Sequence, residues 1–163
     1  MIDLSKLQSK TMVFNKTEFD LSESLKGIEA NYKTRYEKDG YKFKFKIAKN
    51  IKINADKQRI EQVVINLINN AINYSTDNKN IQVNLQKDGE NAKLEIIDHG
   101  IGISQKDLPQ IFDRHFRSTN SQQTTAGSGV GLTIVKEILD YHGYEINVQS
   151  QENKGTTFTI LFS

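Results

Sequence analysis

The chain has 163 residues and a nearly balanced charge, with 22 Lys and Arg against 20 Asp and Glu. This length fits one domain with a sizeable core, and the charge balance favours neither nucleic acid nor a membrane surface as a partner. The absence of cysteine excludes a disulfide framework and cysteine-based metal or redox sites. No apolar run is long enough for a transmembrane helix and no signal-peptide pattern opens the sequence, so we expect a soluble domain.

The first predicted elements are the end of a helix, a short strand and a complete helix. Residues 1–10 have apolar anchors at helical spacing but are too few to form a stable helix alone. A short strand is expected within residues 13–21. Asp20, with Glu23 three residues later, has the pattern of an N-terminal cap for a helix that runs to about Lys38.

Residues 41–47 alternate lysines with aromatic and aliphatic side chains, which predicts a strand with one buried face and one lysine face. They contribute to the basic excess of residues 1–55, which carry 12 Lys and Arg against 7 Asp and Glu. Lysines on a strand are typical of a sheet edge protected against further pairing, and we favour this interpretation over a nucleic-acid-binding stripe. Another short strand is expected at residues 50–56.

The remaining elements are two strong helices and two strand pairs. Residues 56–75 carry a wide apolar stripe at helical spacing, and a second apolar helix is expected at about 131–142. Strands are expected at 81–86 and 92–98, and a closing hairpin around residues 153–155. The predicted fold is an α+β two-layer sandwich, in which a mixed, mostly antiparallel sheet of about five strands packs on three helices.

Four asparagines lie opposite the apolar stripe of the 56–75 helix: Asn66, Asn69, Asn70 and Asn73. Asparagine lowers helix stability by about half a kcal/mol per site relative to alanine, so four such residues in one short segment indicate a binding role. Amide oxygens are hard, neutral ligands that suit Mg²⁺, a metal that usually also keeps waters and substrate phosphates. Taken alone, the pattern also fits a polar outer face.

Asp98 ends an apolar strand and is followed by Gly100 and Gly102 in the stretch DHGIGI. An ionised aspartate accepts hydrogen bonds from a ligand's amino group, and glycines let the backbone approach a flat ligand closely. A capped turn is the alternative interpretation. Further along, IFDRHFRS contains Arg114 and Arg117, which either hold phosphate or remain solvated.

Glycines at 127, 129 and 131 in GSGVGL precede the last predicted helix. Their spacing matches neither the dinucleotide-binding fingerprint nor the P-loop. Backbone N–H groups just before a helix N-terminus form a cradle for anions, which the helix dipole reinforces. Residues 118–128 include no apolar residue larger than alanine, so we expect an exposed, mobile loop that closes over a bound nucleotide.

In this order and spacing, the segments NLINNAINYS, DHGIGI, IFDRHFRS and GSGVGL resemble the N box, first glycine box, F box and second glycine box of sensor histidine kinases. The resemblance is to the ATP-binding catalytic domain of these two-component kinases, and it covers about residues 13–163. The wider superfamily, the GHKL ATPases with the Bergerat fold, includes DNA gyrase, Hsp90-type chaperones and mismatch-repair ATPases. The F box and GLTIVKEILDYHG favour the kinase branch.

The resemblance implies ATP and Mg²⁺ as ligands and gives roles to the matching residues. Asn70 would coordinate Mg²⁺ with support from Asn66, Tyr74 would lie against the adenine, and Asp98 would accept from its exocyclic amine. The implied nucleotide-binding residues are Asn66, Asn70, Asn73, Tyr74, Asp98, Gly100, Gly102, Ile103, Arg114, Arg117, Gly127, Gly129, Gly131, Leu132 and Thr156.

The other implied roles belong to groups of residues. One of the two F-box arginines would reach the phosphates, and the first-box glycines would shape the adenine pocket. The second-box glycines and Leu132 would form a phosphate cradle and the hinge of a lid at about 112–130, while Thr156 would join the water network under the base. Two departures stand out: Asn73 replaces a common lysine that helps hold phosphate, and His99 replaces a common asparagine.

The chain has three histidines, His99, His115 and His142, and none lies in the sequence context of a phosphoacceptor. Residues 1–12 resemble the last turns of the second dimerisation helix, so we expect a catalytic domain whose target histidine lies on a separate helical domain. No side chain is identified as a base for the transfer, and catalysis would consist of positioning and electrostatics around the γ-phosphate.

The resemblance also implies partners and a location. The partners would be the dimerisation domain that carries the phosphoacceptor and, through the parent kinase, a response regulator, with no nucleic acid. The fragment would be monomeric and would belong to the cytoplasmic part of a membrane-bound sensor kinase. Two alternatives remain open, a degenerate nucleotide-binding interaction module and a serine kinase of the anti-sigma-factor type.

Overall fold

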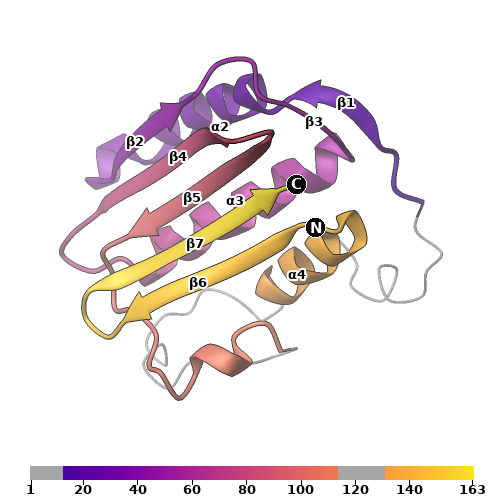
Figure 1. Ribbon diagram of the computed structural model, residues 1–163. Helices are drawn as coiled ribbons and strands as arrows, with labels where there is room; N and C mark the ends of the chain where they lie inside the picture. The colour runs from indigo at the N-terminus through magenta and orange to yellow at the C-terminus, as the bar shows by residue number, and fades with distance from the viewer. Residues whose placement is uncertain (1–12, 114–130) are drawn as a thin grey trace.

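The computed structural model describes residues 13–113 and 131–163 of the chain. Within these ranges a sheet forms one layer, and the helices form a second layer that covers one face of the sheet (Figure 1). The expected helix remnant at the N-terminus and most of the expected lid lie outside the described residues. So do four residues of the expected site, Arg114, Arg117, Gly127 and Gly129.

The main sheet of the described chain has five strands in the order β2-β4-β5-β7-β6. Strands β2 and β4 pair in parallel, and the other neighbours pair antiparallel. The bounds in sheet order are Lys42–Ile47, Asn80–Asp88, Asn91–Asp98, Gly155–Phe162 and Glu145–Gln151. The prediction of a mixed, mostly antiparallel sheet of about five strands is confirmed.

Two further strands, β1 (Thr17–Asp20) and β3 (Lys52–Ala55), pair antiparallel as a separate small sheet. The sequence predicts both strands but not their pairing with each other. A helix and strand β2 lie between them in the chain, and the periodicity of a short strand does not identify a partner that far away.

The described residues form three α-helices, which begin at or close to the predicted positions. Their bounds are Leu21–Tyr36 (α2), Lys57–Tyr74 (α3) and Gly131–His142 (α4). The side chain of Asp20 accepts the N–H of Glu23, and that of Asp56 accepts the N–H of Arg59. Both caps supply an acceptor to an N–H group that has no partner inside its helix, which is why the helices begin there.

The hydrophobic core lies between the sheet and the helices. The apolar side of α3 packs against β4 and β5, and each fully buried aliphatic or aromatic side chain contributes about 1.5–3 kcal/mol. Deeply buried members of this layer include Ile60, Val63, Val64, Leu67, Ile68, Ile81, Val83, Leu94, Ile96, Phe158 and Ile160. This packing holds α3 across the sheet, and its last turn contacts the loop that follows β5.

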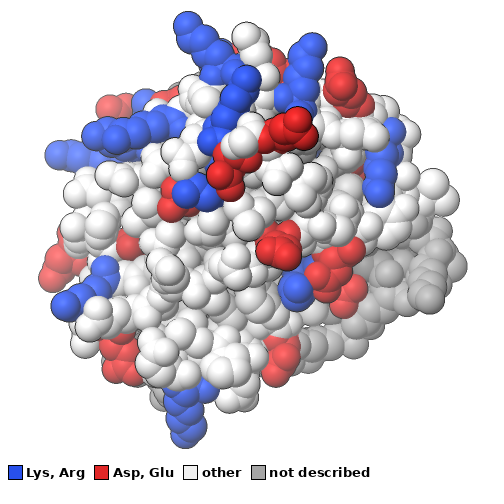
Figure 2. Space-filling view, viewed as in Figure 1, with Lys and Arg blue, Asp and Glu red and all other residues white. Residues whose placement is uncertain are grey.

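Strand β2 lies at the edge of the main sheet, as its lysine pattern predicts. Lys42, Lys44 and Lys46 are exposed, whereas Phe43 is buried in the core. Figure 2 shows lysine and arginine side chains projecting from the upper part of the molecule, where Figure 1 places β2 and the connection to β3. Among the described helices, none is both long and apolar enough to cross a lipid bilayer.

Candidate functional site

A pocket lies where the end of α3, the loop after β5 and the start of α4 meet. Its empty volume is about 470 Å³, including solvent at the mouth. Its walls are mainly apolar and carry a few polar side chains, which is the usual composition of a small-molecule site. The described residues that line it are Asn70, Tyr74, Asp98, Ile101, Gly102, Ile103, Ile111, Leu132 and Thr156.

Asp98 is the buried carboxylate of this pocket, with 5% of its surface exposed. It is the last residue of β5, and its Oδ1 accepts the N–H of Gly100 at 2.9 Å. Burial raises the pKa of Asp98 to about 6, and the backbone N–H groups of Gly100 and Thr156 only partly offset this effect. At neutral pH the side chain is therefore ionised and can only accept hydrogen bonds, in surroundings that favour a ligand N–H as donor.

Thr156 lies next to Asp98, because the two residues pair between β7 and β5. It is 6% exposed, and its Oγ1 lies 2.8 Å from Oγ of Ser150 on β6. The Ser150 hydroxyl also accepts the N–H of Ile103 at 2.7 Å and donates to the carbonyl oxygen of Gly155 at 3.0 Å. This network ties the wall of the pocket to the β6–β7 hairpin.

The four asparagines of α3 have different surroundings. Asn70 lines the pocket together with Tyr74, one helical turn further on. Asn69 instead accepts a hydrogen bond from the hydroxyl of Tyr32 at 2.6 Å, which ties α3 to α2. The contact between the two helices accounts for Asn69 in the asparagine cluster. Asn69 is not among the nucleotide-binding residues that the resemblance implies.

Asn66 lies near the start of α4, where its Nδ2 is 3.5 Å from the carbonyl oxygen of Gly131. This is a long contact, and it places the Asn66 amide beside the N-terminus of α4. Asn73 is partly buried but does not line the pocket. Of the expected metal ligands, only Asn70 therefore faces the pocket itself.

The glycines after β5 allow close approach to the chain's own backbone. A Cβ at Gly100 would overlap the carbonyl of Tyr74, and the neighbouring N–H of Ile101 donates to that same carbonyl at 3.1 Å. Gly102 has φ of +70°, and a Cβ there would overlap the carbonyl of Gln151. The sequence predicts that these glycines approach a flat ligand. In the structure they let the loop fit between the end of α3 and the β6–β7 hairpin, and Gly102 also lines the pocket, so their approach to a ligand stays a prediction.

The structure brings most of the described candidate residues together. Those that line the pocket are Asn70, Tyr74, Asp98, Gly102, Ile103, Leu132 and Thr156. Asn66, Asn73, Gly100 and Gly131 are described but do not line it. Sequence reasoning missed Ile101 and Ile111 as lining residues. Ile101 lies between the two glycines of DHGIGI, and Ile111 opens IFDRHFRS directly after the short helix η2 (Leu108–Gln110). Their positions inside these two motifs are the signal from which they could have been predicted.

Comparison with known proteins gives a family match over two thirds of the chain. Residues 55–163 match the family described as histidine kinase-, DNA gyrase B-, and HSP90-like ATPase. The chain is 40% identical over 116 residues to the signal transduction histidine-protein kinase ArlS of Staphylococcus aureus strain USA300. That alignment covers 71% of this chain and 26% of ArlS, so the chain spans about a quarter of the length of this relative.

Solved structures of histidine kinases have the same fold. A nucleotide-free catalytic domain of histidine kinase ThkA is 29% identical with a TM-score of 0.78, and the match covers 93% of this chain and 95% of that one. Histidine kinase AdeS of Acinetobacter baumannii is 26% identical with a TM-score of 0.77, over 98% of this chain and 73% of that one. The resemblance to the histidine-kinase catalytic domain and the predicted sandwich fold are both confirmed.

Proposed function

Because the chain belongs to the family of histidine kinase-, DNA gyrase B-, and HSP90-like ATPases, we propose that it binds ATP with Mg²⁺. We propose further that it donates the γ-phosphate to a histidine on a separate helical domain of a sensor kinase. The observation that carries this proposal is Asp98, a buried carboxyl group that lines a mainly apolar pocket.

The pocket suits the adenine base. Adenine is flat and apolar on both faces, and its exocyclic amine offers N–H donors to an acceptor such as Asp98. Ile101, Ile103, Ile111 and Leu132 supply apolar contact for the ring, and Tyr74 adds an aromatic side chain at the end of α3. A carboxylate in such surroundings interacts strongly with a ligand N–H, because water does not compete effectively for it.

The phosphates would extend from this pocket towards the start of α4. Asn66 lies beside that helix terminus, where the helix dipole favours negative charge. Asn70 fits Mg²⁺, since its amide oxygen is a hard neutral ligand and the metal can complete its shell with waters and phosphates. When bound, Mg²⁺ would neutralise charge that develops on the phosphates during transfer. The roles of Asn73, Arg114, Arg117, Gly127, Gly129 and Gly131 at the phosphates stay predictions.

The chain's own residues would bind and orient the nucleotide. Transfer forms a bond from a ring nitrogen of the target histidine to the γ-phosphorus and breaks the bond to the bridging oxygen, so that ADP leaves. Precise placement of the two reactants supplies much of the acceleration in such reactions. The response regulator would react with the phosphohistidine of the parent kinase. The chain would be the cytoplasmic catalytic part of that kinase.

Titration of a fluorescent ATP analogue, with Mg²⁺ and with EDTA, tests the binding step. We expect saturable binding that Mg²⁺ strengthens and that unlabelled ATP competes away. Asn70→Asp should change the Mg²⁺ dependence while leaving metal-free ADP binding nearly as it was. Binding that is absent under all these conditions would contradict the proposal at its first step.

Incubation with γ-labelled ATP and a histidine-bearing dimerisation domain tests the transfer step. Transfer should be slow in trans and should speed up with the concentration of either partner, because a covalent link normally provides the effective concentration. The labelled bond should be acid-labile and alkali-stable. A label that is acid-stable and forms on a serine substrate would favour a serine kinase instead. ATP binding without any transfer would favour the alternative of a nucleotide-binding interaction module. The replacement of the common lysine by Asn73 supports that alternative.

A further inference from the structure

A pair of hydroxyl groups connects the wall of the pocket to strand β6. Ser150 on β6 pairs with Thr156 on β7, and their hydroxyl oxygens are 2.8 Å apart. Thr156 lines the pocket beside Asp98, whereas Ser150 is not one of the described lining residues. Either hydroxyl could be the donor if this contact is considered alone.

The other partners of Ser150 decide the direction of this hydrogen bond. Its Oγ accepts the N–H of Ile103 at 2.7 Å and lies 3.0 Å from the carbonyl oxygen of Gly155. A carbonyl oxygen has only lone pairs, so Ser150 must use its single hydroxyl proton there. The contact with Thr156 must therefore run the other way, with Thr156 Oγ1 donating and Ser150 Oγ accepting.

This direction determines what Thr156 offers to a ligand. Its only hydroxyl proton points towards Ser150, so the hydroxyl faces the pocket with lone pairs. The neighbouring Asp98 carboxylate is also an acceptor at neutral pH, and its Oδ1 already holds the N–H of Gly100. These two side chains thus present acceptors to a ligand and no donor. An amino group matches this arrangement, while a carbonyl oxygen in its place would face lone pairs without a hydrogen bond.

We propose that Ser150 is a positioning residue that holds the Thr156 hydroxyl as an acceptor and thereby makes the site prefer a 6-amino purine over a 6-oxo purine. The inference rests on the proposed function, because it assumes that the base lies on Asp98 and Thr156. Without the Ser150 oxygen, the Thr156 hydroxyl can rotate and donate into the pocket. The selectivity for the base then depends on a residue that does not touch it.

The test is the ratio of dissociation constants for ATP and inosine triphosphate, which carries a carbonyl in place of the amine. Both are measured by competition with a fluorescent ATP analogue on the 163-residue chain. In Ser150→Ala the ratio of dissociation constants should move about five- to tenfold closer to one. This change corresponds to the free energy of one hydrogen bond gained or lost. Ser150→Thr keeps the hydroxyl on a β-branched side chain that suits a strand, and it should preserve the ratio.

A double-mutant cycle separates positioning from a general structural role. Thr156→Val should narrow the ratio as well, and Ser150→Ala added to it should change the ratio no further, since Ser150 acts through Thr156. Thr157→Val is the matched control, because successive side chains of a strand point to opposite faces of the sheet. Its ratio should equal that of the parent chain.

Each outcome decides the matter. If Ser150→Ala weakens both nucleotides equally and leaves the ratio unchanged, Ser150 is only structural and the inference is overturned. If Ser150→Ala does not fold, Thr156→Val carries the test, and an unchanged ratio there overturns the inference too. A parent chain that binds neither nucleotide refutes the proposed function instead, and this result is distinct because no ratio can then be measured.

Discussion

Two buried aspartates occupy similar local positions and have different surroundings. Asp56 follows strand β3 and is 9% exposed, while Asp98 ends strand β5 and is 5% exposed. Both carboxylate oxygens of Asp56 have donors, with Oδ1 accepting from the N–H of Arg59 at 3.2 Å and Oδ2 from that of Asn15 at 2.9 Å. Asp98 also accepts backbone N–H groups, those of Gly100 and Thr156, but it faces a pocket.

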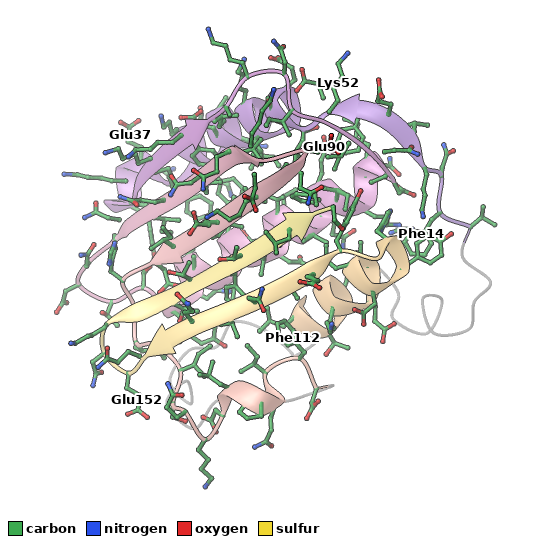
Figure 3. All side chains as sticks on the ribbon, viewed as in Figure 1. Phe14, Glu37, Lys52, Glu90, Phe112 and Glu152 are labelled. Atoms are coloured by element: carbon green, nitrogen blue, oxygen red, sulfur yellow. The ribbon has the colours of Figure 1, made fainter. Side chains whose placement is uncertain are left out.

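The two aspartates also lie in different parts of the fold. Near Asp56, the ring of Phe14 stacks on that of Tyr141 at 3.8 Å, and the N–H of Asp56 donates to Nε2 of His142 at 3.1 Å. Figure 3 shows Phe14 beside the last turn of α4, far from Glu152 in the β6–β7 hairpin. Helix α3 runs from the Asp56 cap to Tyr74 in the pocket, about 27 Å for its 18 residues.

We attribute the difference to a structural role of Asp56 and to the proposed ligand-binding role of Asp98. A buried charge costs free energy unless hydrogen bonds compensate it. Asp56 accepts hydrogen bonds from two backbone segments, and in this way its carboxyl group joins them. Asp98 is less well compensated, as its raised pKa indicates, and a ligand donor would supply what is missing.

The largest effect is expected from Asp98→Ala. Nucleotide affinity should fall about 5- to 150-fold, corresponding to roughly 1–3 kcal/mol for an unpaired buried donor on the ligand. The free energy of unfolding should change little or rise, because a poorly compensated buried charge is removed. Calorimetric titration with ATP and urea unfolding measure the two quantities. Unchanged ATP affinity would remove Asp98 from the site.

Asp56→Ala should have the reverse pattern. The free energy of unfolding should fall by about 1–2 kcal/mol, because the cap of α3 and the link to Asn15 are lost. Thermal denaturation should show a decrease in Tm of about 2–8 °C. ATP affinity at a temperature where the variant is folded should stay close to that of the parent chain. A stable variant that cannot bind ATP would break the comparison.

A change of pH should weaken binding through Asp98. Burial raises the pKa of this carboxyl to about 6, and a ligand N–H donor favours the ionised form. Affinity for adenosine, which has no phosphates to titrate, should therefore fall about tenfold between pH 7 and pH 5. Asp98→Asn should have a flat profile over this range. An equally steep profile in that variant would assign the titration to another group.

The same shift has the opposite sign for the stability of the free protein. The folded-state pKa of Asp98 lies above its ordinary value of 3.8, so the folded state binds this proton more tightly. Its contribution to stability is fully present below about pH 4 and is lost as the pH rises through about 6. Saturating nucleotide should oppose this loss, because it binds the ionised form.

The smallest effect is expected at His142, on the Asp56 side of the comparison. Burial lowers the pKa of this histidine, and its neutral ring accepts the N–H of Asp56 while its Nδ1 meets the carbonyl of Ile138 at 2.8 Å. The contribution of neutral His142 to the stability of the fold is present above the ordinary pKa of 6.5 and is lost as the pH falls through the lowered pKa. His142→Gln should cost about 0.5–1 kcal/mol at pH 7.5 by urea unfolding, and less at acid pH. A cost that is independent of pH would contradict this account.

Local signals predicted much of the fold and the core of the site. The Asp20 and Asp56 caps, the apolar stripe of α3 and the alternation in β2 each act within a few residues, so a single stretch of sequence contains the whole cause. Asp98 was predicted for the same reason, since an acidic residue between a buried strand and two glycines is visible without any partner.

Contacts between distant segments were decided only in the tertiary structure. Asn69 and Asn70 are adjacent and identical in type, yet one meets Tyr32 of another helix and the other faces the pocket. The pairing of β1 with β3, and the fit of Gly100 against the carbonyl of Tyr74, also join segments far apart in the chain. Ser150 gave no signal of its own, because its role depends on Ile103, Gly155 and Thr156 at once. Periodicity and capping act locally, so they determine which helices and strands form in this protein. The packing of those elements determines which side chains contact each other and which ones line the pocket.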